Sequence, residues 1–421
     1  MKVQLHSAAI LIKSVGLIFM FIFFIPGPLK SSQPVPNGQV QSLSFNKINS
    51  SVSFENSKAG LDSGNSMSVS VWVKLNHHSY GKKTGIITLA SNSVYAGQFW
   101  LLENNAQFEF CVQNATAQKT SVRTHVPVKP GTWNHVAGVY TGDELKIYLN
   151  GQLIETAKAK GNINQYRGDF RLLLGSFSSS PDSSASLAGS MDEVSLWKVA
   201  LDVDQVRKIM CRKLNGKEYG LLDYWSMNEA EGAKVPDLGP ARRNGTAEGV
   251  TIVSSGAPVG DESVYTYGGA SLILAHPEFN DSLVITNFSR IPAGLHIYRV
   301  DAFPQDVSQP ETYSGLFASY YFGVFIVEPS GESYEANWYY KGHKGIGDNE
   351  LLDIAVRRNN SEKNCNPLNS MHDENGEKLV AENQKMSNEY ILGLRSKGLS
   401  ADILNFDAVV GENFVEVKWM V

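Results

Sequence analysis

Two neighbouring stretches decide the fold class: Gly131-Thr-Trp-Asn-His-Val-Ala-Gly-Val-Tyr140 and Glu144-Leu-Lys-Ile-Tyr-Leu-Asn-Gly-Gln-Leu-Ile154. In the second stretch, apolar residues alternate with polar or amphipathic ones, which is the period of a half-buried strand. Asn150-Gly151 supplies the two residues with positive φ that a type I′ hairpin requires. The two stretches therefore predict a strand, a chain reversal and a hairpin.

The same alternation recurs on both sides of this hairpin. In Ser68-Val-Ser-Val-Trp-Val-Lys-Leu75 the apolar residues Val69, Val71, Val73 and Leu75 share one face. Further short strands are expected at Ile86–Leu89, Phe108–Val112, Arg171–Gly175 and Met191–Trp197. One helix is expected after Asp202, which can cap it together with Gln205. A single helix among many strands favours an antiparallel sandwich over a βαβ fold.

Several motifs in this half resemble a laminin-G or pentraxin-type jelly roll, the concanavalin A-like fold. They are Trp133-Asn-His-Val-Ala137, Tyr148-Leu-Asn-Gly151, Gly189-Ser-Met-Asp-Glu-Val194 and the Trp197–Leu201 exit into the helix. Their order and spacing cover about residues 40–260. The closing segment, from Leu222-Asp-Tyr-Trp225 onward, resembles that of secreted and surface proteins of Bacteroidetes-type bacteria.

The length of 421 residues predicts more than one domain. We expect a signal peptide at 1–32, a laminin-G-like jelly roll at 33–260, a second antiparallel β-sandwich at 261–398, and an incomplete Ig- or fibronectin-like module at 399–421. Ser255-Gly-Ala-Pro-Val-Gly260 reads as the linker between the two large units. The polar stretch Asn359–Asn388 reads as a loop. Residues 399–421 resemble the entry into a module that precedes a C-terminal sorting domain, which suggests a C-terminally truncated chain.

The N-terminus predicts the compartment. Basic residues precede Val15–Ile25, an apolar run that ends at Pro26-Gly-Pro28. This pattern is typical of a signal peptide, and the run is short for a membrane span. An uncleaved anchor is the alternative. We therefore expect a secreted or cell-surface protein that meets the membrane only through this segment during export.

Charge and cysteine content limit the partners and the covalent structure. The chain has 37 Lys and Arg residues against 42 Asp and Glu, a net charge of −5, which argues against a nucleic-acid partner. The three cysteines are Cys111, Cys211 and Cys365. A disulfide between Cys111 and Cys211 is one hypothesis, and three buried thiols are the other.

Catalytic signatures are missing from the sequence. Retaining glycoside hydrolysis needs two carboxylates about 5–5.5 Å apart, and no Glu-x-Asp-x-Glu run provides them. Asp192 and Glu193 are consecutive in a strand and are expected to point to opposite faces. No nucleophile elbow, zinc motif or phosphate loop is present. We therefore predict that the chain is not an enzyme.

Metal and ligand residues follow from the resemblance and from the aromatic residues. Jelly rolls of this type often hold a structural Ca²⁺ with one carboxylate and backbone carbonyls. The resemblance implies calcium as the one cofactor, with Asp192 as its carboxylate and Asp237 as the second choice; the alternative is that Asp192 accepts backbone N–H bonds. Tyr80, Tyr95 and Trp100 lie near loop-rich segments and are candidate contacts for a sugar or a protein.

The sequence thus favours a non-catalytic binding or adhesion protein whose jelly-roll loops face an extracellular glycan or protein ligand. One alternative is a glycoside hydrolase of the same fold, which would need a pair of carboxylates on the concave face. The other is a structural spacer in a surface protein, which would lack an exposed aromatic cluster. His135 shares a face with Ala137 and Val139, so we expect a hydrogen-bonded core histidine.

Overall fold

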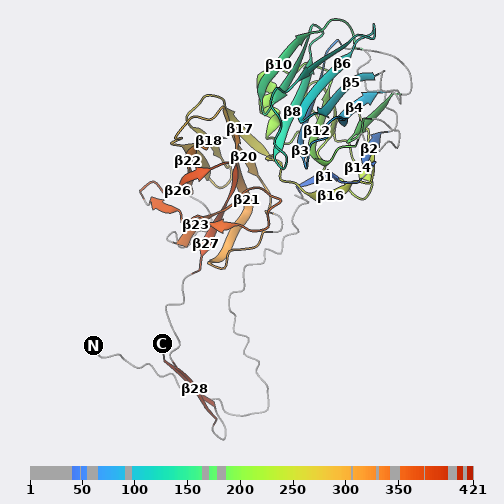
Figure 1. The fold of residues 1–421 in the computed structure, drawn as a ribbon. Helices are drawn as coiled ribbons and strands as arrows, with labels where there is room; N and C mark the ends of the chain where they lie inside the picture. The colour runs from blue at the N-terminus through green and yellow to red at the C-terminus, as the bar shows by residue number, and fades with distance from the viewer. Residues whose placement is uncertain are drawn as a thin grey trace.

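The protein is built almost entirely of antiparallel strands that form two β units (Figure 1). The computed structural model describes residues 40–47, 49–54, 65–90, 97–163, 170–177, 186–304, 307–328, 331–341, 351–373 and 375–396, and the backbone of strands at 405–410 and 415–420. The predicted signal peptide lies outside the described residues. Within these ranges, no helix combines the length and the hydropathy that a membrane span requires.

The first β unit consists of two eight-stranded sheets. Sheet A has the order β10(Gln152–Lys158), β9(Glu144–Leu149), β8(Trp133–Tyr140), β3(Met67–Leu75), β12(Gly189–Trp197), β1(Gln41–Phe45), β16(Thr251–Ser254), with β13(Leu221–Trp225) also paired to β12. Sheet B has the order β14(Lys234–Val235), β15(Gly245–Glu248), β2(Ser51–Phe54), β11(Arg171–Leu174), β4(Lys83–Ala90), β5(Gly97–Asn104), β6(Gln107–Gln113), β7(Lys119–Arg123). The all-β sandwich predicted from the alternation is confirmed.

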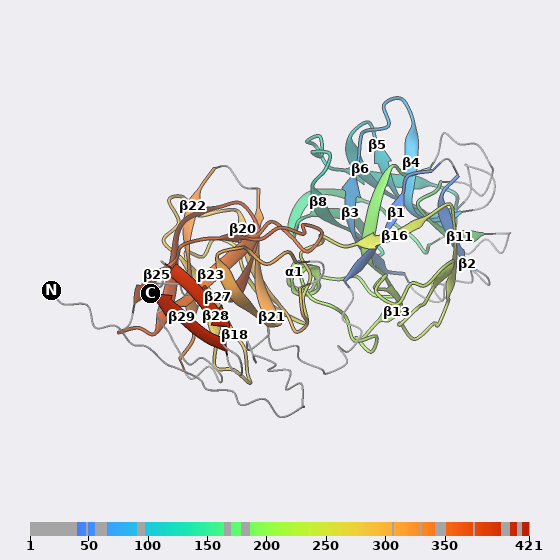
Figure 2. The ribbon, with the colours of Figure 1, turned by 90° about the horizontal axis from the view of Figure 1, so that it is seen from below.

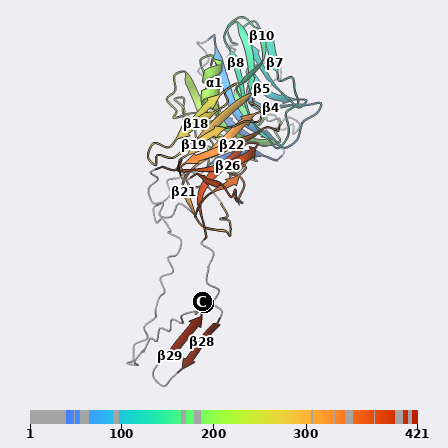
Figure 3. The same ribbon diagram turned by 90° about the vertical axis from the view of Figure 1, so that its left-hand side faces the viewer.

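The second β unit contains two smaller sheets. Sheet C has the order β17(Glu262–Thr266), β20(Gly294–Val300), β21(Tyr313–Val327), β27(Asn388–Arg395), β23(Leu352–Arg357), β24(Asn366–Pro367). Sheet D has the order β18(Leu272–Ala275), β19(Ser282–Thr286), β22(Ser333–Tyr339), β26(Lys378–Lys385), β25(Met371–Asp373), four strands of which lie side by side in Figure 3. The last two strands, β28(Asn405–Val410) and β29(Val415–Met420), pair with each other.

The core of the first unit follows from the alternation of its strands. Val69, Val71 and Val73 of β3 all point between sheets A and B and are fully buried. The predicted turn is also present, because Asn150 and Gly151 both have positive φ between β9 and β10. Local sequence therefore determines both the buried face and the hairpin of this region.

Helix α1(Val203–Met210) begins as the sequence predicts. The Asp202 side chain accepts a hydrogen bond from the Gln205 backbone, and the Gln205 side chain accepts one from the Asp202 backbone N–H. Val206 and Met210 are buried beneath it. The helix lies at the junction of the two units (Figure 2), with Val206 on the outer face of sheet A.

The polar stretch at Asn359–Asn388 is not the loop that its composition predicts. Strand β26 lies inside it and pairs with β22. Leu379 and Ala381 of this strand are buried in the core between sheets C and D, while Val380 between them is only partly buried. The burial of these two apolar side chains anchors β26 in the core. The polar residues Glu382, Asn383 and Gln384 that follow obscure the alternation of apolar and polar residues from which a strand would be predicted.

The two units share a hydrophobic junction. Trp72 of β3 points away from the core of the first unit and packs edge-on against Phe325 of β21, with ring centroids 5.2 Å apart. Met210 and Cys211, at the end of α1, are buried in the same cluster as Tyr298 of β20. Sheet C therefore uses one face for its own core and the other for contact with the first unit.

The segment between the units is buried rather than exposed. All six residues from Ser255 to Gly260 are buried. A Cβ added at Gly256 would lie 2.4 Å from Oδ1 of Asn359, and one added at Gly260 would lie 2.2 Å from the carbonyl oxygen of Arg299. The small residues that read as a flexible linker instead allow the two units to approach each other closely.

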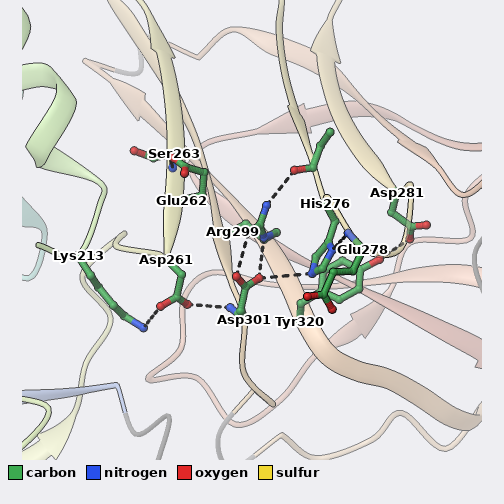
Figure 4. Close-up of polar contacts among 11 residues, drawn as sticks. Lys213, Asp261, Glu262, Ser263, His276, Glu278, Asp281, Arg299, Asp301 and Tyr320 are labelled. Atoms are coloured by element: carbon green, nitrogen blue, oxygen red, sulfur yellow. Dashed lines mark hydrogen bonds and ion pairs between the residues drawn. The ribbon is translucent and has the colours of Figure 1, made fainter. Parts of the chain in front are cut away.

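Ion pairs surround this apolar junction. Lys213, which follows α1, donates to Asp261 at 2.9 Å, and Asp261 in turn accepts from the backbone N–H of Asp301 at 2.8 Å (Figure 4). Arg299 forms a bidentate pair with Asp301, and His276 lies 3.6 Å from the same carboxylate. Burial and the Arg299 charge lower the pKa of His276. This network fixes the edge of sheet C beside the first unit.

Candidate functional site

The two outer faces of the first unit have different neighbours. The outer face of sheet A is covered by α1 and by the second unit, through residues such as Trp72 and Val206. On sheet B, Phe99 and Leu101 of β5 point into the core, so Trp100 and Leu102 point outward. We call the outward positions of β11, β4, β5, β6 and β7 the β4–β7 face. Strands β4, β5, β6 and β11 are labelled in Figure 2, and β7 is labelled in Figure 3.

A buried carboxylate lies on the β4–β7 face. Oε2 of Glu109 is 2.6 Å from Nδ2 of Asn104, 3.1 Å from Nζ of Lys83 and 3.3 Å from Nη2 of Arg123. Burial alone would raise the pKa of Glu109, but the Asn104 hydrogen bond and the charges of Lys83 and Arg123 outweigh it and lower the pKa. Glu109 is therefore an ion-paired carboxylate at neutral pH and is poorly suited to donate a proton.

Tyr80 is an exposed aromatic residue at the end of this face. Its side chain is 73% exposed, and its ring lies edge-on to His78 with centroids 5.7 Å apart. The turn that carries it is tied to the end of β5, because the backbone N–H of Gly81 donates to Oδ1 of Asn105 at 2.9 Å. Tyr80 is thus exposed, and its role as a contact residue stays a prediction.

The other two predicted contact residues differ from Tyr80. Trp100 is on the β4–β7 face but is only 2% exposed, with Phe177 packed against it and Nζ of Lys119 lying 4.7 Å from its ring centroid. Its indole N–H has no hydrogen-bond partner among the described residues. Because the ring is covered, it offers no stacking surface in this state. Tyr95 lies outside the described residues.

The orientation predicted for Asp192 and Glu193 is wrong. Met191 and Val194, which flank them, both point into the core, so the two carboxylates share the outer face of sheet A. A bulge in the pairing of β12 with β3 and a positive φ of 51° at Glu193 cause this arrangement. Asp192 accepts hydrogen bonds from Ser255 Oγ and from the Glu193 backbone N–H.

Burial dominates the electrostatics of this pair. It raises the pKa of Asp192 to about 8 against the hydrogen bonds from Ser255 and Glu193. The pKa of Glu193 is raised by burial and by the nearby Asp192, although Tyr224 donates a hydrogen bond to it. At neutral pH the pair therefore binds at least one proton.

A small cavity lies beside this pair, under α1. Ser70, His135, Glu193 and Ser195 contribute its polar lining, and its volume of about 10 Å³ is room for one water molecule. Nε2 of His135 lies 3.2 Å from Oγ of Ser70, and burial lowers the pKa of His135 to about 3. His135 is thus the hydrogen-bonded, buried histidine that the sequence predicts. The cavity is too small to admit a sugar.

The Asp237 carboxylate is occupied by backbone donors. It accepts hydrogen bonds from the N–H groups of Tyr224, Gly239 and Arg243 at 2.9, 2.8 and 2.7 Å. In the part of the chain that the structure describes, no three His, Cys, Asp or Glu side chains are grouped so that they could hold a metal ion. The observed role of Asp237 is to close the turn after β14.

Substituting Asp237 tests this role against a metal site. Asp237→Ala is expected to lower the free energy of unfolding by about 1–3 kcal/mol, because buried N–H groups lose their acceptor. Urea unfolding should show the same loss in excess Ca²⁺ and in EDTA. If Ca²⁺ instead stabilises the parent protein but not Asp237→Ala, the residue is a calcium ligand.

Of the two hypotheses for the cysteines, the structure shows the second: Cys111, Cys211 and Cys365 are free, buried thiols, and Cys111 and Cys211 form no disulfide. Cys111 is a free thiol on the outer face of sheet B beside Trp100, whereas Cys211 is a free thiol in the junction beside Trp72. The two belong to separate clusters on opposite sides of the sandwich. Burial raises the pKa of Cys111 to about 11 and that of Cys211 well above its ordinary value, so both thiols stay protonated at neutral pH.

A family comparison supports the fold assignment. Residues 46–207 match the Laminin_G_3 model, described as the concanavalin A-like lectin/glucanases superfamily. The match covers most of the first unit, from just before β2 into α1, and confirms the jelly roll that the sequence motifs predict. No protein of curated function matches the chain significantly.

Solved structures resemble the chain only distantly. A candidate carbohydrate-binding protein from Bacteroides ovatus ATCC 8483 is 19% identical with a TM-score of 0.42, covering 53% of this chain and 62% of its own, so the chain spans less than two thirds of it. A heptameric pentraxin from Limulus polyphemus is 17% identical with a TM-score of 0.39, covering 53% and 98%. The CBM40 module of a Ruminococcus gnavus sialidase, bound to α2,3-sialyllactose, is 17% identical with a TM-score of 0.33, covering 40% and 97%.

Proposed function

From a first unit of concanavalin A-like fold, we propose that the chain is a secreted or cell-surface protein that binds a glycan along the β4–β7 face without cleaving it. The observation that carries this proposal is the position of exposed Tyr80 at the end of a polar, ion-paired sheet face. The apolar C–H face of a sugar ring can pack on such an aromatic ring while amides and charges bind its hydroxyl groups.

The position of the second unit supports the choice of face. Sheet A offers Ser70, Trp72 and Ser195 on its outer side, but α1 and sheet C cover them. A ligand as broad as an oligosaccharide needs an open surface. On the other side of the sandwich, Tyr80 in the turn before β4 is exposed and the side chains of Lys83 and Arg123 are half-exposed, whereas the outward-facing Trp100 of β5 is covered.

The described carboxylates favour binding over hydrolysis. A retaining glycosidase needs one carboxyl group that holds a proton and one nearby that does not, both open to the sugar. Glu109 is ionised and engaged by two cations. Asp192 and Glu193 do lie on one face, but that face is buried under α1. Release of reducing sugar from any bound polysaccharide would contradict the non-catalytic part of the proposal.

The exposed aromatic residue gives the direct test. Tyr80→Ala in the full chain should weaken binding to glycan-array hits by about tenfold, because the stacking contact is lost. Tyr219→Ala is the matched control: Tyr219 is 89% exposed but follows α1, away from the β4–β7 face. Equal loss in both variants, or no loss in Tyr80→Ala, would place the ligand elsewhere.

A further inference from the structure

Two cationic side chains are held next to each other on the β4–β7 face. Lys83 and Arg123 come from strands β4 and β7, and both contact the same Oε2 atom of Glu109. The Glu109 side chain is 4% exposed, whereas those of Lys83 and Arg123 are 45% and 46% exposed. One side of each cation is therefore fixed by the protein and the other side is open to solvent.

The buried carboxylate explains why the two cations stay together. Two positive side chains that contact the same oxygen atom lie close enough to repel each other, and the negative charge of Glu109 offsets that repulsion. Asn104 fixes the carboxylate by donating to it at 2.6 Å. The three side chains Lys83, Glu109 and Arg123 carry a net positive charge in a prearranged geometry, which are properties of an anion-binding site. The Glu155 carboxylate also lies beside Arg123, because it accepts a hydrogen bond from the Arg123 backbone N–H at 2.5 Å.

The rest of the face adds positive charge. Lys119 and Arg171 also occupy outward positions, paired in register with Gln113 and Ala90. Among the described outward residues of β11, β4, β5, β6 and β7, Glu109 is the single carboxylate against four cations. The whole chain has a net charge of −5, so the positive charge is a local property of this face.

We infer that the glycan bound here is anionic, and that Lys83 and Arg123 together bind one of its carboxylate or sulfate groups. This inference rests on the proposed glycan-binding function and names the chemical class of its ligand. The planar guanidinium of Arg123 can form a bidentate pair with such a group, and Lys83 adds a point charge beside it. Neutral sugars would leave this charge unmatched.

A matched pair of polymers tests the inference in the full chain. Polygalacturonate should bind at least about tenfold more tightly than the same polymer with its carboxylates methyl-esterified. The affinity for polygalacturonate should fall steeply between about 20 and 200 mM NaCl, because salt screens the attraction between exposed charges. The affinity for the neutral polymer should not change with salt. Chondroitin sulfate and its desulfated form make the second pair and distinguish sulfate from carboxylate.

Substitutions localise the effect. Lys83→Gln and Arg123→Gln should each weaken binding of the anionic polymer by about tenfold, and Arg123→Lys should restore only part of it. Removing Lys83 or Arg123 also takes away one ion-pair partner of Glu109 and can disturb the site for that reason alone. Arg171→Gln removes a positive charge from the same face and leaves the Glu109 ion pairs intact. It should weaken binding by about two- to threefold and flatten the salt dependence. Lys217→Gln, an exposed lysine after α1, is the control.

The outcomes separate the two proposals. If the esterified and charged polymers bind equally and Tyr80→Ala weakens both, the glycan-binding function stands and the anionic ligand is wrong. If the charged polymer binds but Arg123→Gln and Arg171→Gln have no effect, the charge is recognised elsewhere and the inference is again wrong. If neither series nor any other glycan binds, both proposals fail together.

Discussion

Replacing Trp72 by alanine is expected to destabilise the protein by about 3–5 kcal/mol and to separate the unfolding of its two β units. Trp72 is fully buried, yet its ring lies in the junction rather than in the core of its own unit. It packs against Phe325 and donates its indole N–H to the carbonyl of Met210 at 2.6 Å. Alanine therefore leaves a cavity between the units and an unsatisfied carbonyl at the end of α1.

Calorimetry and proteolysis measure the two parts of this prediction. The parent protein should unfold in one transition, because a buried apolar junction couples the units, and Trp72→Ala should show two. The segment Ser255–Gly260, buried in the parent protein, should become open to protease. Trp225→Ala is the control, since Trp225 is equally buried but lies inside the first unit. One transition and full protection in Trp72→Ala would show that the junction does not couple the units.

The same contact determines how binding should be measured. A fragment that ends near residue 260 would expose Trp72, Met210 and Cys211, which the second unit buries. Such a surface favours aggregation. The full chain is therefore the proper material for glycan binding, although the sequence alone suggests that the jelly roll could be studied by itself.

The fold of the first unit could be predicted because its signals are local. Alternation in β3 gives the buried face, Asn150-Gly151 gives the hairpin, and Asp202 gives the start of α1. Each depends on residues a few positions apart, for which backbone preference and burial agree.

The junction could not be predicted, because nothing local distinguishes it. Trp72 alternates with core valines, so its own strand pattern places it on the outer face of the sheet. It is buried there by Phe325 of β21, a tertiary contact with a strand some 250 residues later in the chain. Gly256 and Gly260 read as flexible because glycine is common in linkers, but here it permits close packing. A glycine-containing segment can therefore be a flexible linker or a tightly packed junction, and the local sequence does not distinguish the two.

The candidate site was predictable only in part for a similar reason. Tyr80 could be selected because it lies in a turn, where exposure is the usual outcome. Trp100 is also aromatic, but an outward position on a sheet is exposed only if no other segment packs over it. Phe177 packs over Trp100, and the sequence around Trp100 does not reveal this contact. The partners of Glu109 come from strands β4 and β7, so only the register of sheet B brings them together.

The bulge in β12 was hidden because Glu193 adopts a positive φ without being glycine or asparagine. Strict alternation would separate the carboxylates of Asp192 and Glu193, whereas the bulge places both under α1. This pair consequently gives the molecule a pH dependence that its composition does not suggest.

Asp192→Asn is expected to remove a large part of the pH dependence of stability between pH 5 and 8. The pKa of Asp192 is about 8 in the folded protein, raised by burial from its ordinary value of 3.8. The folded state therefore retains a proton that the unfolded state releases, so its contribution to stability is complete below about pH 4 and is lost as the pH rises to about 8. Between pH 5 and pH 8 the free energy of unfolding of the parent protein should therefore fall by a few kcal/mol, on the order of 1 kcal/mol per pH unit.

Asparagine preserves the local contacts while removing the titration. Its amide oxygen can accept from the Glu193 backbone N–H, and its amide nitrogen can donate to Ser255 Oγ, the two partners of the native carboxyl group. Urea unfolding at pH 5 and pH 8 should therefore show the variant losing less stability than the parent as the pH rises. Asp204→Asn, at an exposed position in the first turn of α1, controls for loss of a carboxylate. Parallel pH profiles for Asp192→Asn and the parent would mean that Asp192 is ionised in the fold, and that Ser255 is bound to a charged group rather than to a neutral one.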